Sequence, residues 1–454
     1  MGAGGRGSMR REHATAGFEA ALRGRIERGE LRPGDMILSL SEICARYELK
    51  RSTAQRALNR LVAAGYLRTV HGRGAFVSDG FRGNRLLVYA MPRSPVRPYL
   101  ESLIDESSGR AAFTTERAAA DVICSPHTDL HGPNSPVPLD PWLRGTPLAS
   151  PDAWIPKAGD RYRLDGRTYA LPVYASPVVL FCNLELLRRA GIKMPADRWN
   201  WSEFSSAIEA LRPLCDTDVA GVFPFHRPVS FYMSFLAQNE ARVFARGGRC
   251  GLGTDRALEA ISYLRTLRRL SGGATADGRS FVDAFLGGRS AVVMWGGTLA
   301  DQLSREAPFD WGWVPLPEHR ARACGLHSEG LHIGSGSTRR DEAWSFVKTC
   351  LSVSSQRALA TRGMPFPARS GPAGRLVAGS GPPYQRMLFE MSIGVGEEHR
   401  FGAGILRLLN RSLHRVLDPD LSEQAAFALC RETCKILDGV IQARKEERLW
   451  ETVA

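Results

Sequence analysis

The sequence lacks the features of a secreted or membrane-spanning chain. No stretch approaches the roughly 20 consecutive apolar residues that a transmembrane helix requires. The first eleven residues are rich in Gly and Arg, and no apolar run follows them, so we predict no secretory signal peptide. We therefore expect a cytoplasmic protein that makes no membrane contact.

Paired cysteines are also missing. The nine cysteines are scattered along the chain and form no Cys-x-x-Cys motif, so neither a disulfide framework nor a zinc site is indicated. Cys430 and Cys434 are one helical turn apart, but nothing nearby completes a set of metal ligands. We predict reduced, buried thiols and no bound metal.

The common catalytic motifs are absent as well. The chain contains no Gly-x-Ser-x-Gly in a helix context, no His-Glu-x-x-His and no P-loop. Lysine is scarce, and nearly all the positive charge comes from arginine. We predict no catalytic residues and no cofactor, and hence a protein that is not an enzyme.

What the sequence does have is length and positive charge. Its 454 residues suffice for two or three domains, and a hydrophobic fraction of 43% is ordinary for a globular protein. The formal net charge is +13, with a pI near 9.6. Such a balance favours a polyanionic partner, with nucleic acid first.

The N-terminal pattern predicts three helices followed by a hairpin. Phe18, Leu22 and Ile26 recur at helical spacing, and Pro33-Gly34 ends that segment. A second helix, capped by Ser39 or Ser41, runs to about residue 47, and a third spans 51–64. Strands at 66–70 and 75–77 then flank a Gly-Arg-Gly turn. This order is typical of a winged helix-turn-helix.

Basic residues concentrate in this segment. From Arg46 to Arg73 seven basic residues stand against one acid, Glu48, which gives the positive surface that phosphates require. The first residues of a recognition helix face base edges, and the wing reaches a minor groove or a phosphate. The predicted DNA-contacting residues are Ser41, Lys50, Arg51, Ser52, Thr53, Gln55, Arg56 and Arg73.

Residues 31–77 carry a family resemblance. Leu-Arg-Pro-Gly-Asp, Leu-Lys-Arg-Ser-Thr-Ala-Gln-Arg-Ala-Leu-Asn-Arg-Leu, Ala-Gly-Tyr-Leu and Gly-Arg-Gly-Ala-Phe-Val follow in order and resemble the winged helix of the GntR family. The resemblance implies a double-stranded DNA operator and a homodimer. Ser41 and Gln55 stand where the family usually has Arg, so the operator sequence does not carry over. Phosphate-type roles carry over better for Arg51, Thr53 and Arg73.

Beyond this module, strand and helix patterns alternate. Leu86–Val88 and Asp121–Cys124 look like strands, with a helical segment at 98–107 between them, which predicts α/β architecture. The last ninety or so residues look largely helical. The expected domains are a flexible tail at 1–13, a winged helix-turn-helix at 14–79, a linker at 80–85 and a sensor domain at 86–454.

A second resemblance covers about two hundred residues of the sensor domain. Its six segments are 165–172 (DGRTYALP), 179–192 (VLFCN and LLRRAGI), 200–204 (NWSEF), 285–297 (FLGGRSAVVMWGG), 313–317 (WVPLP) and 342–347 (EAWSFV). Their order is similar to family 1 extracellular solute-binding proteins, the sugar-binding components of ABC importers. The resemblance implies a two-lobed periplasmic-binding-protein-like α/β domain with ligand in the cleft and closure on binding.

The pocket of such a domain needs aromatic faces for sugar C–H surfaces and polar groups for hydroxyls. Trp295, expected at a strand end, is the first candidate, and Tyr174 is the second. Core packing remains an alternative role for either ring. Phe231, Tyr232, Thr298, Glu329 and Gly330 complete the predicted ligand-binding set.

Together these patterns predict a sequence-specific transcription regulator that a small effector, a sugar or oligosaccharide, controls through lobe closure. Two alternatives stay open. GntR-type regulators can carry a pyridoxal-phosphate-binding aminotransferase-like domain, although Lys157, Lys193 and Lys348 lack the setting of a Schiff-base lysine. The large domain could instead serve only in assembly.

Overall fold

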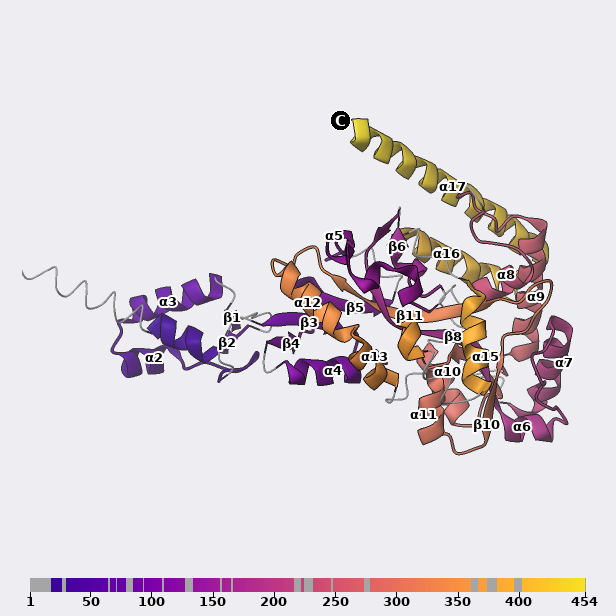
Figure 1. Cartoon of the computed structure of the whole chain (residues 1–454), viewed down its shortest axis with the longest axis horizontal. Helices are drawn as coiled ribbons and strands as arrows, with labels where there is room; N and C mark the ends of the chain where they lie inside the picture. The colour runs from indigo at the N-terminus through magenta and orange to yellow at the C-terminus, as the bar shows by residue number, and fades with distance from the viewer. Residues whose placement is uncertain are drawn as a thin grey trace, which may run out of the picture.

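The computed structural model describes most of the chain. The described residues are 18–26, 30–63, 66–70, 72–78, 85–92, 94–107, 110–126, 134–155, 157–164, 166–215, 222–223, 232–245, 248–272, 278–360, 366–373, 382–395 and 402–453. The predicted tail and most of the predicted linker lie outside these ranges. Figure 1 shows a small N-terminal head beside a much larger α/β body.

The head, residues 18–78, has the predicted order of elements. A helix over residues 18–26 is followed by α2 (Leu40–Tyr47), α3 (Arg51–Ala63), β1 (Leu67–Val70) and β2 (Gly74–Val77). Ser39 and Glu42 form a capping box at the start of α2, so Ser39 rather than Ser41 is the cap. Its core includes Phe18, Ile43 and Leu61, and it shares no residue with the cores of the body.

Lobe 1 of the body is built on parallel strands. β3 (Leu86–Ala90) lies between β4 (Ala111–Phe113) and β5 (Val122–Pro126) and pairs parallel with both. Helices and short strands of this lobe are α4 (Arg97–Glu106), α5 (Asp140–Leu143), β6 (Arg163–Leu164), β7 (Arg167–Thr168), α12 (Arg340–Cys350) and α13 (Val353–Ala360). Its core combines strand residues such as Val88 with Tyr99 and Trp344 from the helices.

Lobe 2 is mostly helical around two short strands, β9 (Val292–Gly296) and β10 (Trp311–Pro315). Its helices are α6 (Leu184–Arg189), α7 (Trp201–Leu211), α8 (Met233–Gln238), α9 (Asp255–Ser271), α10 (Gly278–Leu286), α11 (Leu299–Glu306), α15 (Pro382–Ser392), α16 (Gly402–Val416) and α17 (Glu423–Val453), and β12 (Gly394–Val395) follows α15. The predicted helical character of the C-terminal region is confirmed.

Two long strands join the lobes. The first half of β8 (Leu171–Asn183) pairs antiparallel with β11 (Cys324–Ile333), and its second half pairs with β9 and β10. β11 in turn continues into lobe 1 beside β5. One eight-stranded sheet therefore runs through both lobes, and we call β8 and β11 the crossing strands.

One expectation about the cysteines is wrong. Cys250 and Cys434 are joined by a disulfide, although 184 residues separate them in sequence. The sequence offered no motif because one partner lies in a loop and the other on α17, so only the fold brings them together. Five of the other seven cysteines are buried thiols, as predicted, and Cys44 and Cys215 are half-buried.

Candidate functional site

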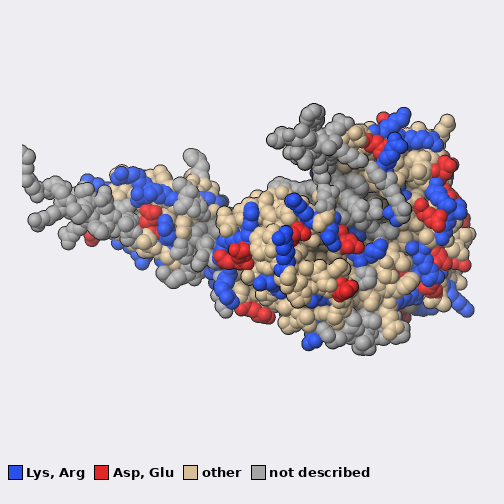
Figure 2. All heavy atoms as spheres, turned by 45° about the horizontal axis from the view of Figure 1, so that its top comes forward, with Lys and Arg blue, Asp and Glu red and all other residues tan. Residues whose placement is uncertain are grey.

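The first half of α3 presents an exposed polar surface. Ala54, Ala57, Leu58 and Leu61 turn inward and hold the helix on the head, which leaves the remaining positions outside. Lys50, Arg51, Ser52, Gln55 and Arg56 are exposed, and Thr53 is half-buried. Among the described residues, neither Arg51 nor Arg56 forms an ion pair, whereas Arg60 at the far end binds Glu19 at 3.0 Å. Figure 2 shows several basic side chains on the visible face of the head.

The predicted wing is also in place. Gly72 and Gly74 take the positive φ values of +73° and +109° that the β1–β2 turn requires, and Arg73 between them is exposed. Ser41 lies inside α2 and is exposed. The structure thus places the predicted DNA-contacting residues on α2, on α3, on the wing and, for Lys50, directly before α3.

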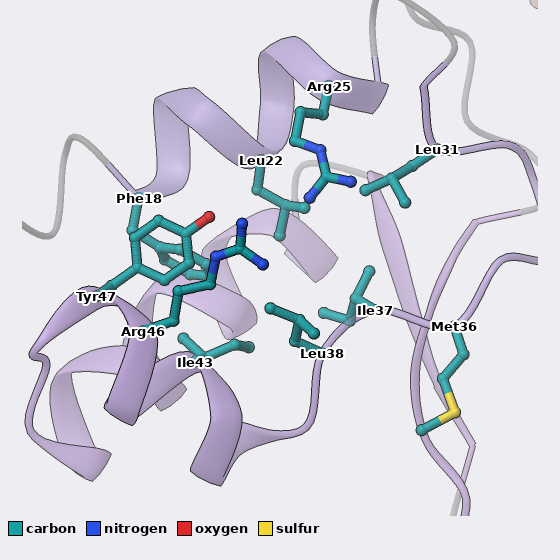
Figure 3. Close-up of a pocket in the computed structure, with 10 residues that line it drawn as sticks. All are labelled: Phe18, Leu22, Arg25, Leu31, Met36, Ile37, Leu38, Ile43, Arg46 and Tyr47. Atoms are coloured by element: carbon teal, nitrogen blue, oxygen red, sulfur yellow. The ribbon is translucent and has the colours of Figure 1, made fainter.

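A hollow of about 210 Å³ opens between the first helix and α2 (Figure 3). Leu22, Ile37 and Ile43 line it, and Tyr47 packs edge-on against Phe18 at a ring distance of 4.8 Å. Arg46 lines the same hollow, so this basic residue lies apart from the exposed row on α3.

A polar cluster lies on the crossing strands and against them from β5 and the β3–α4 loop, and we call it the crossing cluster: Ser94, Cys124, Tyr174, His327 and Glu329. All of its members except the half-buried His327 are buried. The Ser94 hydroxyl donates to Glu329 Oε2 at 2.5 Å, and the Cys124 thiol lies 3.7 Å from the same oxygen. The Tyr174 hydroxyl is 3.1 Å from His327 Nδ1. Burial, reinforced by the charge of Glu329, raises the pKa of the Tyr174 phenol. Donors and acceptors from both crossing strands and from the β3–α4 loop therefore meet here.

The neighbouring Gly330 has a packing role. The register of β11 against β8 shifts between Glu329 and Gly330, and a Cβ at Gly330 would lie 2.8 Å from the Tyr162 ring. The Tyr162 hydroxyl is 3.1 Å from Ser328 Oγ, on the opposite face of β11 from Glu329. A side chain at Gly330 would therefore clash with the Tyr162 ring.

Trp295 belongs to β9 of lobe 2, which pairs with the crossing strand β8. It stands one residue before the end of β9, opposite Val179 of β8, and is half-buried against the cluster that includes Phe181. The next residues approach the crossing strands closely, since a Cβ at Gly296 would meet His327 at 3.1 Å and one at Gly297 would meet Ser176 Oγ at 2.8 Å. The end of β9 therefore lies against the strands that carry the crossing cluster.

The other predicted ligand residues are less central. Thr298 is half-buried just before α11, Tyr232 is buried just before α8, and Phe231 lies outside the described residues. Sequence reasoning missed Ser94, Ser176 and His327. Ser94 could have been found because polar residues that follow a strand at its carboxyl end commonly line α/β ligand sites, but His327 sits within a strand and gave no signal.

No cluster of three or more His, Cys, Asp or Glu side chains suited to a metal ion occurs within the described part of the chain. Nor does any described helix combine the length and apolarity that crossing a bilayer requires.

The fold and these sites define a two-lobed solute-binding-protein architecture with a winged-helix head. The chain belongs to the bacterial extracellular solute-binding protein family, whose pattern it matches over residues 101–357. Residues 15–77 match the bacterial regulatory proteins of the gntR family. Both predicted resemblances are thus confirmed, and neither family is typically enzymatic.

Curated relatives cover part of the chain. A binding protein of Brucella abortus (strain 2308) is 26% identical over 194 residues, which are 40% of this chain and 46% of the relative. A lipoprotein of Streptomyces antibioticus is 26% identical over 208 residues. The chain spans about half the length of these relatives, 46% in each case.

Solved structures match almost over their full length. The solute-binding protein of Thermotoga lettingae bound with α-D-tagatose gives a TM-score of 0.68 at 14% identity, covering 78% of this chain and 100% of that one. The GacH receptor of Streptomyces glaucescens gives 0.64 at 16% identity, with coverages of 78% and 98%. MalE of Xanthomonas citri gives 0.64 at 17%, with coverages of 80% and 99%. At these identities the likeness establishes the fold.

Proposed function

We propose that this protein is a DNA-binding transcription regulator whose two-lobed domain binds a sugar or oligosaccharide and controls DNA binding by lobe closure. The observation that carries the proposal is the combination of an exposed basic recognition helix with a polar cluster on the strands that join two lobes. A homodimer fits this role, because winged-helix regulators commonly read two half-sites about one helical turn apart.

The head supports the DNA-binding part. Lys50, Arg51 and Arg56 leave their charges in solvent at the start of α3, where a recognition helix meets the major groove. Arg73 extends from the wing towards a phosphate or the minor groove. Ser41, Ser52, Thr53 and Gln55 add short hydrogen-bonding groups beside them.

The crossing cluster supports the ligand-binding part. Hydroxyl, carboxylate and imidazole groups at Ser94, Glu329 and His327 suit the hydroxyls of a polyol. Trp295, near the end of β9, offers an aromatic face on the other side of the sheet, because it pairs with Val179 while the next residue, Gly296, faces His327. The similar solved structures include proteins in complex with cycloalternan, acarbose, tagatose and mannitol. A ligand that contacts both lobes favours the closed state and shifts the population towards it.

Of the alternatives, an aminotransferase-like domain finds no support, because residues 101–357 belong to the solute-binding family instead. A large domain that serves only in assembly remains the second candidate. A measurement of ligand binding distinguishes this assembly role from the sensor function.

The first test is a thermal-shift screen of the full chain against mono- and oligosaccharides. A ligand at a hundred times its Kd adds about 2.7 kcal/mol of stability, which shifts the melting temperature measurably. A selective shift supports the sensor function. No shift with any saccharide would favour the assembly role.

The pocket assignment has its own test in Trp295→Ala. We expect this variant to lose the saccharide-induced shift and to keep its affinity for operator DNA. Trp311→Ala is the matched control, because Trp311 is also half-buried and packs on Phe181 at 5.8 Å. If Trp295→Ala responds like Trp311→Ala, Trp295 is a core residue and not a ligand residue.

A further inference from the structure

The disulfide between Cys250 and Cys434 joins two elements that are distant in sequence. Cys250 lies in the loop between α8 and α9, and Cys434 lies in the first half of α17, with Cα atoms 4.9 Å apart. Both residues are half-buried and therefore within reach of a small reagent from solvent.

The loop is fitted to the helix around this pair. The Cys250 backbone N–H donates to Asp438 Oδ1 at 2.6 Å, one turn beyond Cys434. A Cβ at Gly253 would lie 3.5 Å from Arg431 Cγ, and one at Gly248 would lie 4.0 Å from Ile441. The Asp438 hydrogen bond holds Cys250 next to α17 independently of the bond between the sulfurs, and the glycines let the loop backbone approach the helix closely.

Three basic residues lie next to the pair in sequence. Arg249 precedes Cys250 in the loop, and Arg431 and Lys435 flank Cys434 on α17, while Glu432 and Asp438 are the acids on the same part of the helix. Nearby cations lower the pKa of a cysteine, and the thiolate is the reactive form. Burial disfavours the thiolate at most of the other cysteines, because it raises the pKa of Cys124, Cys182, Cys215, Cys324, Cys350 and Cys430.

We propose that Cys250 and Cys434 form a reversible oxidation site that a hydroperoxide closes and cellular thiols open. One thiolate attacks the peroxide oxygen, and the alkoxide or hydroxide leaves as the cysteine becomes a sulfenic acid. The second thiolate then attacks that sulfur and releases water, so two thiols and one peroxide give one disulfide, one water and one alcohol or second water.

A disulfide is stable in an oxidising compartment but is kept reduced in the cytosol unless it is regulatory. A regulatory role for this disulfide therefore rests on the proposed function, in which the protein binds DNA. The reversible formation of the disulfide does not rest on that function, since it can be measured without DNA or effector.

The physical consequence of oxidation falls on α17. Its first turns pack in the core of lobe 2 through Ala426, Cys430 and Leu437, and its later turns extend away from the body (Figure 1). Reduction leaves this junction held by the Asp438 hydrogen bond and a few van der Waals contacts. Oxidation fixes the loop and the helix together at the last buried turn.

The test uses the full chain, reduced with dithiothreitol, desalted and treated with one equivalent of hydrogen peroxide. Maleimide labelling under denaturing conditions, read by intact mass, should show two fewer labels after peroxide, and returning the chain to excess reduced glutathione should restore both. Cys250→Ser and Cys434→Ser should each abolish the loss of two labels, leaving at most one label lost to a sulfenic acid, and Cys215→Ser, a half-buried cysteine outside the disulfide, should preserve the loss of two.

Hydrogen exchange of the backbone amides in residues 431–441 reports how firmly α17 is held, which labelling of the thiols does not measure. We expect faster exchange in the reduced wild type and in Cys434→Ser than in the oxidised wild type. A link that survives excess reduced glutathione would make the bond a permanent structural disulfide and overturn the proposal. Failure of the link to form with peroxide would overturn it too. If Cys434→Ser does not fold, Cys250→Ser in the loop provides the same comparison.

Discussion

Arg51, at the start of α3, and Arg60, near its end, differ in their electrostatic environment. Arg51 is exposed and forms no ion pair within the described part of the chain, whereas Arg60 binds Glu19 at 3.0 Å. A cation that is free in the unbound state loses no internal partner when it meets a phosphate. This difference makes the two residues a matched pair for testing the DNA surface.

We predict that Arg51→Ala weakens operator binding by about 1.5–3 kcal/mol, the range for a hydrogen bond to a charged group. The slope of log K against log salt concentration should fall by about 0.9, because one fewer phosphate is neutralised. Fluorescence anisotropy at several salt concentrations measures both, with Arg60→Ala as the control. Equal losses in the two variants would show that general charge, rather than the start of α3, governs binding.

His332 is a buried histidine in β11. Neither ring nitrogen has a hydrogen-bond partner within the described residues, and burial, aided by the charge of Arg117, lowers its pKa to about 3. The folded protein therefore keeps this imidazole neutral while the unfolded chain takes up a proton below about pH 6.5. Because the folded pKa is the lower one, its contribution to stability is intact above pH 6.5 and is lost as the pH falls.

We predict that each pH unit below about 6.5 costs the wild type about 1.4 kcal/mol of unfolding free energy through His332. His332→Leu removes this contribution, so the difference in stability between the variant and the wild type should grow from pH 7 to pH 5 in favour of the variant. Urea unfolding at a series of pH values measures it. A difference that stays constant with pH would contradict the assignment.

At the scale of elements, α15 links the two lobes. Met387 and Met391 pack with Ile155 and Ala158 of lobe 1, while Glu390 on the same helix binds Arg198 of lobe 2 at 2.6 Å. Both charged side chains are almost fully buried, and burial raises the pKa of Glu390 although Arg198 opposes the shift. The helix is thus held by apolar contacts on one side and an ion pair on the other.

We predict that Arg198→Met destabilises the protein by about 3–5 kcal/mol near pH 8, because it leaves a buried carboxylate without its cation. The loss should shrink as the pH falls, because burial raises the pKa of Glu390 and a protonated carboxyl group needs no cation. The double variant Arg198→Met with Glu390→Leu should recover most of the stability, since neither charge remains. Urea unfolding measures the free energy of unfolding of both variants. A double variant as unstable as the single one would refute the role of the ion pair.

The elements differ in how far the sequence predicted them. In the head, helical spacing of Phe18, Leu22 and Ile26 and the Gly-Arg-Gly turn mark local structure, so the element order followed directly. In the body, the pairing of Tyr174 with His327 and the bond between Cys250 and Cys434 join residues more than 150 positions apart. A single sequence carries no signal for such contacts, because they depend on the register of the crossing strands and on how α17 packs.

At the scale of the whole molecule, the head and the body have separate hydrophobic cores. No residue of the head core belongs to the clusters that build the two lobes. Domains with separate cores unfold separately unless a large interface couples them.

We predict two transitions in scanning calorimetry of the full chain. A saccharide that binds the body should raise the temperature of the larger transition and leave the smaller one unchanged. A truncated chain that begins at residue 85 should show the larger transition alone. A ligand that shifts both transitions would instead reveal that the head docks on the body.

β3 is the first element after the head, and it lies inside lobe 1 between β4 and β5. The head is therefore joined covalently to lobe 1 and not to lobe 2. In the proposed closure, lobe 2 would move relative to lobe 1 without changing that connection. A contact between lobe 2 and a second molecule, such as the other subunit of a proposed dimer, would then carry the signal to DNA, so we expect the proposed switch to act between chains rather than along one.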